Sequence, residues 1–254
     1  MKNMKKNKYR YKKTSRKRLN RKKIGIILLI ITTIVFFMYN NMKQKYQSAE
    51  TITYQKANKI DKCIVIDAGH RGEEEPGCIF GNVYEKTICL QIAEKLKTKL
   101  EKEYEKVVMT RTEDINVYLN ERARIANREN ADIFVSIHQN ALEDDNITSG
   151  IETWYNPVKD TNSMMLAKHI QENIINSTNA NDLGTKESKG LIVIKNTQMP
   201  SCLVETGFLS STEERSKLID ENYQEKIAEG IYNGIKSYFN YTEENKDTPE
   251  GNNV

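Results

Sequence analysis

The chain has 254 residues, of which 38% are hydrophobic and 29% charged, with 12 glycines and 4 prolines. This composition can fill one domain core and excludes collagen-like and proline-rich disordered chains. The formal net charge of +4 misleads, because residues 1–23 contain thirteen Lys and Arg and no Asp or Glu. The remaining chain has 26 basic and 35 acidic residues, a net charge of −9. We therefore expect no nucleic-acid partner, since such a partner requires positive charge on the folded surface.

The basic segment, Met1–Lys23, precedes sixteen uncharged residues, Ile24–Tyr39. This apolar run predicts a transmembrane anchor, slightly shorter than the roughly 20 residues that span a bilayer, with flanking cations reaching the interface. The cations place the N-terminus in the cytoplasm, in contact with anionic lipid, and the rest of the chain outside. A signal peptide is the alternative, but no small-residue cleavage site follows Tyr39.

Beyond the anchor, residues 40–61 are polar and aperiodic, which predicts a linker, and residues 241–254 form a polar tail. Between them, strand patterns alternate with helical patterns. The predicted strands are Lys62–Asp67, Lys106–Thr110, Asp132–Ile137, Ile151–Tyr155, Leu191–Ile194 and Ser201–Glu205, and the predicted helices are Glu85–Glu103, Val117–Glu129, Met164–Ile175, Thr212–Ile219 and Tyr223–Phe239. This alternation predicts a single α/β domain over residues 62–240, with a mainly parallel central sheet flanked by helices.

The four cysteines are irregularly spaced and contain no C-x-x-C pair. Cys63 and Cys202 lie in apolar, strand-like runs, so we expect buried free thiols. The sequence leaves open a disulfide among Cys63, Cys78, Cys89 and Cys202, because pairing depends on geometry.

Chemically reactive side chains follow the predicted strands. His70 follows the first strand, His138 follows the strand Asp132–Ile137, and Glu205 ends the strand Ser201–Glu205. Parallel strands share one carboxyl edge, where α/β proteins bind ligands, so we expect these groups to converge. His169 lies in a helical pattern and is expected on the surface.

Two histidines and one carboxylate, with a fourth position open, form a common catalytic zinc site. The carboxylate candidates are Glu73, Glu74 and Glu75 in a loop and Glu85 at the start of a helix. We favour Glu85, because the first residue of a helix is rigidly placed, and Glu205 then becomes a nearby base. A single histidine after a strand is more often structural, so the prediction rests on the joint placement.

Several ordered blocks carry a family resemblance: IVIDAGHRG (64–72), the helix-opening Glu85-Lys86, TRTED (110–114), LNERARIAN (119–127), ADIFVSIHQNA (131–141), GIETWY (150–155) and PSCLVETGFLS (200–210). From about residue 63 to 239 the sequence resembles the zinc-dependent N-acetylmuramoyl-L-alanine amidases of bacterial cell walls, in the type-3 class. The resemblance implies that Zn²⁺ is held by His70, Glu85 and His138 and that Glu205 is the catalytic acid and base.

The implied reaction is hydrolysis of the amide bond between the lactyl group of N-acetylmuramic acid and L-alanine of the stem peptide in peptidoglycan. A small membrane-anchored amidase domain is most similar to the germination-specific, spore-cortex type, which predicts a role in sporulation and germination. The sequence leaves open whether the amidase requires an activating protein partner. The alternatives are a zinc peptidase acting within the stem peptide and a non-catalytic, membrane-anchored wall-binding protein.

Two further residues are candidates for substrate binding. Arg111 follows a predicted strand and is expected either to bind a peptide carboxylate with two donors or to form a salt bridge with Glu113 or Asp114. Asn140 is expected to orient a ligand or to cap a turn. Trp154 is expected in the core.

Overall fold

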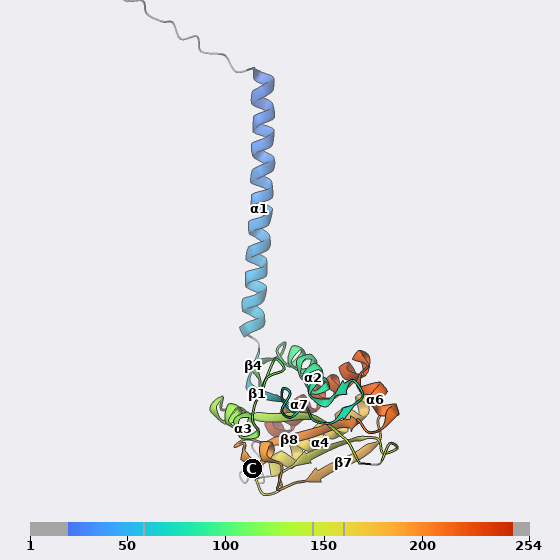
Figure 1. Ribbon diagram of the computed structural model, residues 1–254. Helices are drawn as coiled ribbons and strands as arrows, with labels where there is room; N and C mark the ends of the chain where they lie inside the picture. Colours follow the sequence, from blue (N-terminus) through green and yellow to red (C-terminus); the bar gives the residue numbers. More distant parts are fainter. Residues whose placement is uncertain (1–19, 58, 144, 160, 246–254) are drawn as a thin grey trace, which may run out of the picture. The chain divides into compact units, whose positions relative to one another are not determined.

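The computed structural model describes residues 20–57, 59–143, 145–159 and 161–245. It divides into two compact units, one ending at Ala57 and the other beginning at Asn58 (Figure 1). Most of the predicted basic segment and most of the polar tail lie outside the described residues.

The described residues of the first unit form one helix, α1 (Arg21–Ala57). Its segment Lys22–Ser48 is long and apolar enough to cross a membrane, a test that a signal sequence near an N-terminus also passes. The aperiodic linker predicted from residue 40 is therefore wrong in its structure, because the helix continues to Ala57. Residues 40–57 contain no glycine or proline, so nothing interrupts the backbone hydrogen bonds that began in the apolar run.

The second unit is built on a six-stranded sheet in the order β4-β1-β5-β8-β6-β7. Its strands are β1 (Ile60–Ala68), β4 (Tyr104–Met109), β5 (Ile133–Asn140), β6 (Ile151–Tyr155), β7 (Asp182–Glu187) and β8 (Ser201–Phe208). All neighbouring strands are parallel except β6 and β8, which are antiparallel. The predicted α/β fold with a mainly parallel sheet is confirmed.

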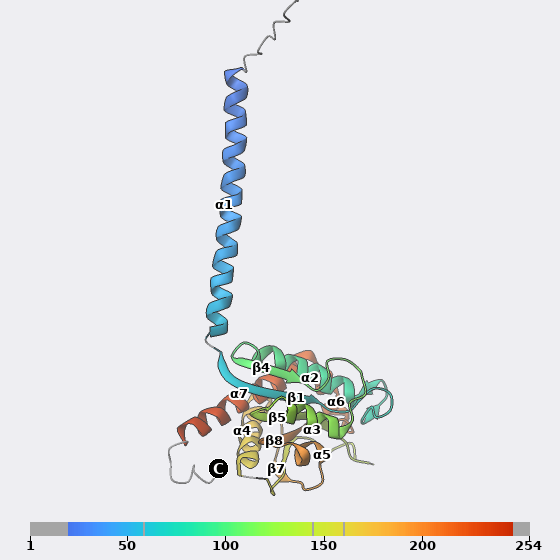
Figure 2. The ribbon, with the colours of Figure 1, turned by 90° about the vertical axis from the view of Figure 1, so that its left-hand side faces the viewer.

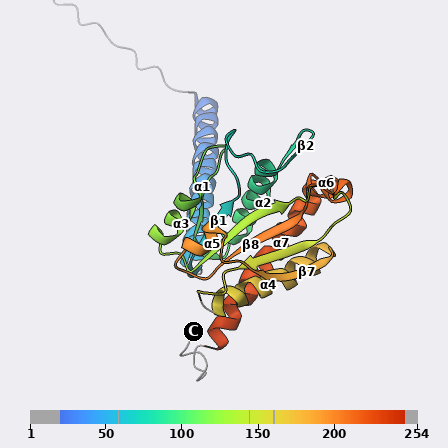
Figure 3. The ribbon, with the colours of Figure 1, turned by 60° about the horizontal axis from the view of Figure 1, so that its bottom comes forward.

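Helices cover both faces of the sheet. The larger core joins Ile64, Val135 and Val204 to α2 (Glu85–Leu100), α4 (Thr161–Thr178) and α7 (Glu221–Glu244). Figure 2 shows β1, β4 and β5 beside α2, and Figure 3 shows α4 beside α7. The smaller core joins Val65, Phe134 and Leu203, which alternate with the first set along the strands, to α3 (Leu119–Arg128) and α5 (Ile192–Asn196).

Four short elements differ from the sequence-based predictions. The apolar run 191–194, predicted as a strand, forms the one-turn helix α5, since four apolar residues carry no usable periodicity. The strand β7 and the hairpin β2 (Ile79–Phe80) and β3 (Val83–Tyr84) were not predicted. The helix α6 (Thr212–Leu218) was predicted and is confirmed, with Ser211 as its N-cap.

The structure shows the bonding state of the four cysteines and the position of His169. All four thiols are free, with Cys89 and Cys202 buried and Cys63 and Cys78 half-buried. His169 is half-buried rather than on the surface, because its Nδ1 lies 2.9 Å from Ser237 Oγ where α4 packs on α7. Burial lowers the pKa of His169 and so favours the neutral ring there.

The α4–α7 contact depends on two glycines. A Cβ at Gly230 would lie 2.5 Å from Ile174 Cα, and one at Gly234 would lie 2.5 Å from Ile170 Cα. These backbone atoms cannot move aside as a flexible side chain can, so the helices approach closely only with glycine at both positions.

We predict that Gly234→Ala lowers the free energy of unfolding by about 2 kcal/mol, because the steric clash outweighs the gain of about 1 kcal/mol in helix propensity. Chemical denaturation of both proteins measures the difference. Gly190→Ala is the control, because its Cβ would meet no atom within 4 Å, and it should change stability by less than about 0.5 kcal/mol. Equal stability of Gly234→Ala and the parent would contradict the packing argument.

Candidate metal centre

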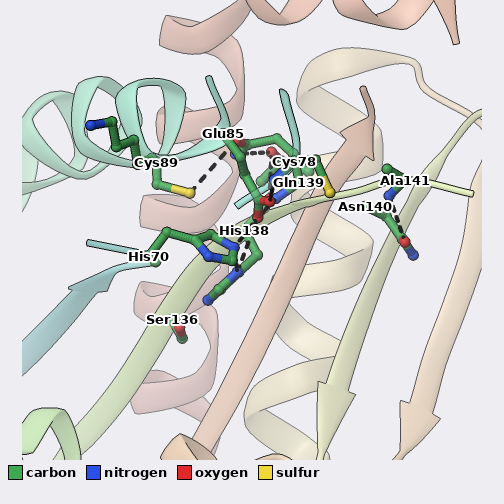
Figure 4. Close-up of polar contacts among 12 residues, drawn as sticks. His70, Cys78, Glu85, Cys89, Ser136, His138, Gln139, Asn140 and Ala141 are labelled. Atoms are coloured by element: carbon green, nitrogen blue, oxygen red, sulfur yellow. Dashed lines mark hydrogen bonds and ion pairs between the residues drawn. The ribbon is translucent and has the colours of Figure 1, made fainter. Parts of the chain in front are cut away.

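The three predicted metal ligands, His70, Glu85 and His138, converge near the carboxyl ends of β1 and β5 (Figure 4). His70 Nε2 lies 2.7 Å from Glu85 Oε1 and 3.1 Å from His138 Nδ1, and His138 Nδ1 lies 3.1 Å from Glu85 Oε1. Ligands at 2.0–2.1 Å from a tetrahedral ion lie roughly 3.3 Å from one another, which is close to these separations. The donor set and its spacing therefore fit a small divalent cation.

Each ligand is placed by a different kind of element. His70 follows β1 and has φ of 62°, a left-handed conformation that is uncommon outside glycine. Glu85 is the first residue of α2, and His138 lies within β5. The loop glutamates take no part, since Glu73 and Glu74 are exposed and Glu75 pairs with Arg71 at 3.0 Å.

Two glycines leave room for the ligand side chains. A Cβ at Gly69 would lie 2.5 Å from His138 Nε2, and a Cβ at Gly77 would lie 2.5 Å from Glu85 Oε2 and 2.7 Å from His70 Cδ2. Gly77 also has φ of 75°, which only glycine adopts freely. The absence of a side chain at these two positions lets the backbone approach the three ligand side chains closely without a steric clash.

Glu85 is held in its ionised form. It is 2% exposed, and both carboxylate oxygens accept backbone N–H groups, from Cys78 at 2.9 Å and from Gln139 at 3.1 Å. Burial alone would raise the pKa of Glu85, but contacts with His138 and His70 outweigh it and lower the pKa. An ionised carboxylate beside two imidazoles is ready to bind a cation.

The loop that carries His70 is held by a buried ion pair between Asp67 and Arg122. Asp67 accepts hydrogen bonds from Thr110 Oγ1 at 2.6 Å, Ser136 Oγ at 2.7 Å and Arg122 at 2.7 Å. Burial would raise the pKa of Asp67, but Arg122 and the two hydroxyl groups outweigh it and lower the pKa. Arg122 also donates to the backbone carbonyls of Ala68 and His70.

Arg122 was not among the site residues predicted from the sequence, although its position on the helix indicated a buried charge. It shares the inward face of α3 with Ala126, four residues later, where a charged residue requires a buried partner.

Arg111 is 2% exposed and belongs to the same support. Its guanidinium donates to the carbonyls of Ala68, Gly69, Lys86 and Glu113. Only one of its five N–H groups is left, so the predicted two-donor contact with a peptide carboxylate has no free pair of donors. The alternative, a salt bridge with Glu113 or Asp114, is not found among the described residues: Arg111 binds the backbone carbonyl of Glu113, and Asp114 pairs with Lys86 at 2.6 Å.

Glu205 lies beside the three ligands, directly opposite His138 on β5 and Glu152 on β6. Within the described part of the chain, its Oε2 atom is buried and has no hydrogen-bond donor. Burial and the nearby carboxylates of Glu85 and Glu152 outweigh the attraction of His138 and raise the pKa of Glu205 to about 8. This glutamate therefore holds a proton near neutral pH more readily than an exposed one does.

The side chain of Asn140 contacts the local backbone and a neighbouring carboxylate. Its Oδ1 accepts the N–H of Ala141 at 2.8 Å, and its Nδ2 donates to Glu152 at 3.0 Å. Glu152, which is 2% exposed and was not singled out in the sequence, also accepts the indole N–H of Trp154 at 3.0 Å and pairs with Lys186. Trp154 is half-buried, not fully within the core.

We predict that Arg122→Leu lowers the free energy of unfolding by about 3–5 kcal/mol, because it leaves Asp67 buried and unpaired. Thermal or denaturant unfolding measures the loss. Arg124→Leu, on the same helix but with its side chain 71% exposed, is the control and should cost about 0.5 kcal/mol or less. Similar costs for the two variants would show that the Asp67 pair is not a major support.

Comparisons with known proteins agree with this geometry. The profile of the N-acetylmuramoyl-L-alanine amidase family matches residues 64–237. An uncharacterized protein of Bacillus subtilis, YqiI, is 40% identical over 73% of this chain and 89% of its own length. The germination-specific N-acetylmuramoyl-L-alanine amidase of B. subtilis is 30% identical over 74% of this chain and 83% of its own length.

Among solved structures, the CwlD amidase of Clostridioides difficile, in complex with the GerS lipoprotein, aligns with a TM-score of 0.68 and 35% identity. The alignment covers 71% of this chain and all of that one. The family match spans more than half of the chain and includes His70, Glu85, His138 and Glu205. The chain therefore belongs to the N-acetylmuramoyl-L-alanine amidases, a family of hydrolases that act on peptidoglycan.

Proposed function

We propose that this amidase is a zinc enzyme, with His70, Glu85 and His138 as the protein ligands of Zn²⁺ and Glu205 as its catalytic acid and base. The observation that carries the proposal is the convergence of three ligand atoms, all within 4.8 Å of one another, beside the carboxyl group of Glu205, whose buried Oε2 atom has no hydrogen-bond donor among the described residues. Two imidazoles and one carboxylate are typical protein ligands of catalytic zinc.

When bound, Zn²⁺ supplies Lewis-acid chemistry that polarises a carbonyl group and makes water acidic near neutral pH. The protein supplies the proton transfers. Glu205 accepts a proton from the water that attacks the lactyl carbonyl of N-acetylmuramic acid. It then returns that proton to the leaving amine of L-alanine, so one carboxyl group acts as base and then as acid.

The products of the reaction separate the amidase from the alternatives considered for the sequence. The amidase frees the amino group of L-alanine and leaves the glycan without peptide, whereas a zinc peptidase would cut within the stem peptide. Mass spectrometry of digested peptidoglycan distinguishes these products. A non-catalytic wall-binding protein would not need all four site residues, whereas this chain retains each of them in its expected type.

The location that we propose is the outer side of a membrane, with α1 as an uncleaved anchor. The thirteen cations before the apolar run favour a cytoplasmic N-terminus and an extracytoplasmic catalytic unit. The similarity to a germination-specific amidase supports a role in spore-cortex processing. The CwlD amidase was solved with a lipoprotein bound, which supports an activating protein partner for this chain as well.

Glu205→Gln is expected to keep the fold and the metal and to lower kcat by about 10²–10⁴-fold, because glutamine is nearly isosteric but cannot transfer the proton. Release of new amino termini from purified peptidoglycan measures turnover, and elemental analysis measures zinc. Glu94→Gln, at an exposed position on α2, is the control and should keep normal turnover. Turnover by Glu205→Gln close to that of the parent would remove Glu205 from the reaction.

His70→Ala and His138→Ala are each expected to lose bound zinc, because two protein ligands hold the ion much less tightly than three. His169→Gln alters the remaining histidine and should keep one zinc per chain. A chelator should abolish the activity of the parent, and added Zn²⁺ should restore it. One zinc per chain in His70→Ala or His138→Ala would exclude that histidine as a ligand.

A further inference from the structure

The sheet face that carries Glu205 continues past the metal ligands onto β6 and β7. Glu152 lies opposite Glu205, and Trp154 lies opposite Lys186, so their side chains share one face. This is the face that α3 and α5 cover at its other end, where Leu203 is buried. On β6 and β7 this face is only partly covered, since Trp154, opposite Leu203, packs against the edge of that core but stays half-buried, and the side chain of Lys186 remains partly exposed.

The buried carboxylate of Glu152 fixes the groups on this partly covered face. Its Oε1 atom accepts from Asn140 Nδ2 and Trp154 Nε1, both at 3.0 Å, and its Oε2 atom pairs with the ammonium of Lys186. The side chain of Glu152 is 3% exposed, while that of Lys186 is 41% exposed. The Lys186 ammonium also lies 5.7 Å from the centre of the Trp154 ring.

The ammonium of Lys186 is therefore held on one side by the buried carboxylate of Glu152 and is accessible to solvent on the other. An ammonium group has three N–H donors, and Glu152 takes one of them. The anchored position reduces the entropy that Lys186 would lose when it binds an anion, and the indole beside it offers a flat apolar surface. These features describe a site for a carboxylate attached to an extended, partly apolar chain.

We propose that Lys186 and Trp154, held by Glu152, bind an anionic residue of the stem peptide. The proposal rests on the proposed function, in which the amide bond to be cut lies at Glu205. The Lys186 ammonium pairs with Glu152, which lies directly opposite Glu205, so it lies within about two strand spacings of Glu205, roughly 10 Å or the length of about three extended residues. The carboxylate thus belongs to one of the first three residues after the amide bond.

The test compares muropeptides that carry free stem-peptide carboxylates with the same muropeptides after amidation, using the zinc-loaded full chain. For the parent, amidation at the recognised residue should raise KM about tenfold and leave kcat within twofold. Lys186→Met should raise KM about tenfold for the carboxylate substrate and should no longer distinguish the two substrates. Lys186→Arg should restore the distinction, because it keeps the charge.

The control is Lys168→Met, an exposed position on α4 at the opposite face of the sheet, which should behave as the parent does. Because Lys186→Met leaves Glu152 buried without its cation, the double variant Glu152→Gln with Lys186→Met removes both charges and keeps the test valid if the single variant unfolds. If Lys186→Met retains the preference for carboxylates, or changes both substrates equally, the ion pair is structural and the proposal fails.

A binding measurement separates this proposal from the proposed function. Calorimetry with the Glu205→Gln variant and intact muropeptides measures affinity without turnover. Tighter binding of the carboxylate form that disappears when Lys186→Met is added would support the site even if the products were those of a peptidase. Equal affinities would overturn the site, even if the products were those of an amidase.

Discussion

The metal centre depends on the buried ion pair between Asp67 and Arg122. His70 has an unfavourable backbone conformation, and it keeps it because Arg122 binds the carbonyls on both sides of the turn while Asp67 holds Arg122. Asp67 is in turn bound by hydroxyl groups after β4 and on β5. The pair therefore links β1, its two neighbouring strands and α3, and it fixes one ligand by fixing the backbone beneath it.

The two carboxyl groups nearest the centre of the site are kept in opposite states. Glu85 accepts backbone N–H groups and contacts both imidazoles, which lowers its pKa despite burial. Glu205 has one oxygen without a donor among the described residues and two carboxylates nearby, which raises its pKa. The same residue type thus serves as a permanent anion at one position and as a proton carrier at another, because the surroundings differ.

The sequence was sufficient for five of the six sheet strands, for most helices and for the expectation that His70, Glu85, His138 and Glu205 lie close together, since strong periodicity and ordered motifs mark them. It was insufficient where a side chain's role depends on distant contacts. Arg111 was expected to bind a peptide carboxylate or to form a salt bridge, but it binds four backbone carbonyls. The place of Glu152 beside Glu205 depends on the antiparallel pairing of β6 with β8, which the sequence did not indicate. The polar sequence of β7, with Gly184 inside it, resembles a turn and forms a strand only because β6 offers it a partner.

The polar sequences of the two edge strands, β4 and β7, also protect the sheet from self-association. Both outermost strands carry charge, with Glu105 and Lys106 exposed on β4 and Asp182 and Glu187 exposed on β7. Gly184 has a left-handed conformation, which departs from regular strand geometry. Charged and irregular edges pair poorly with the edges of other sheets, so copies crowded together resist aggregation although their inner strands are rich in isoleucine and valine.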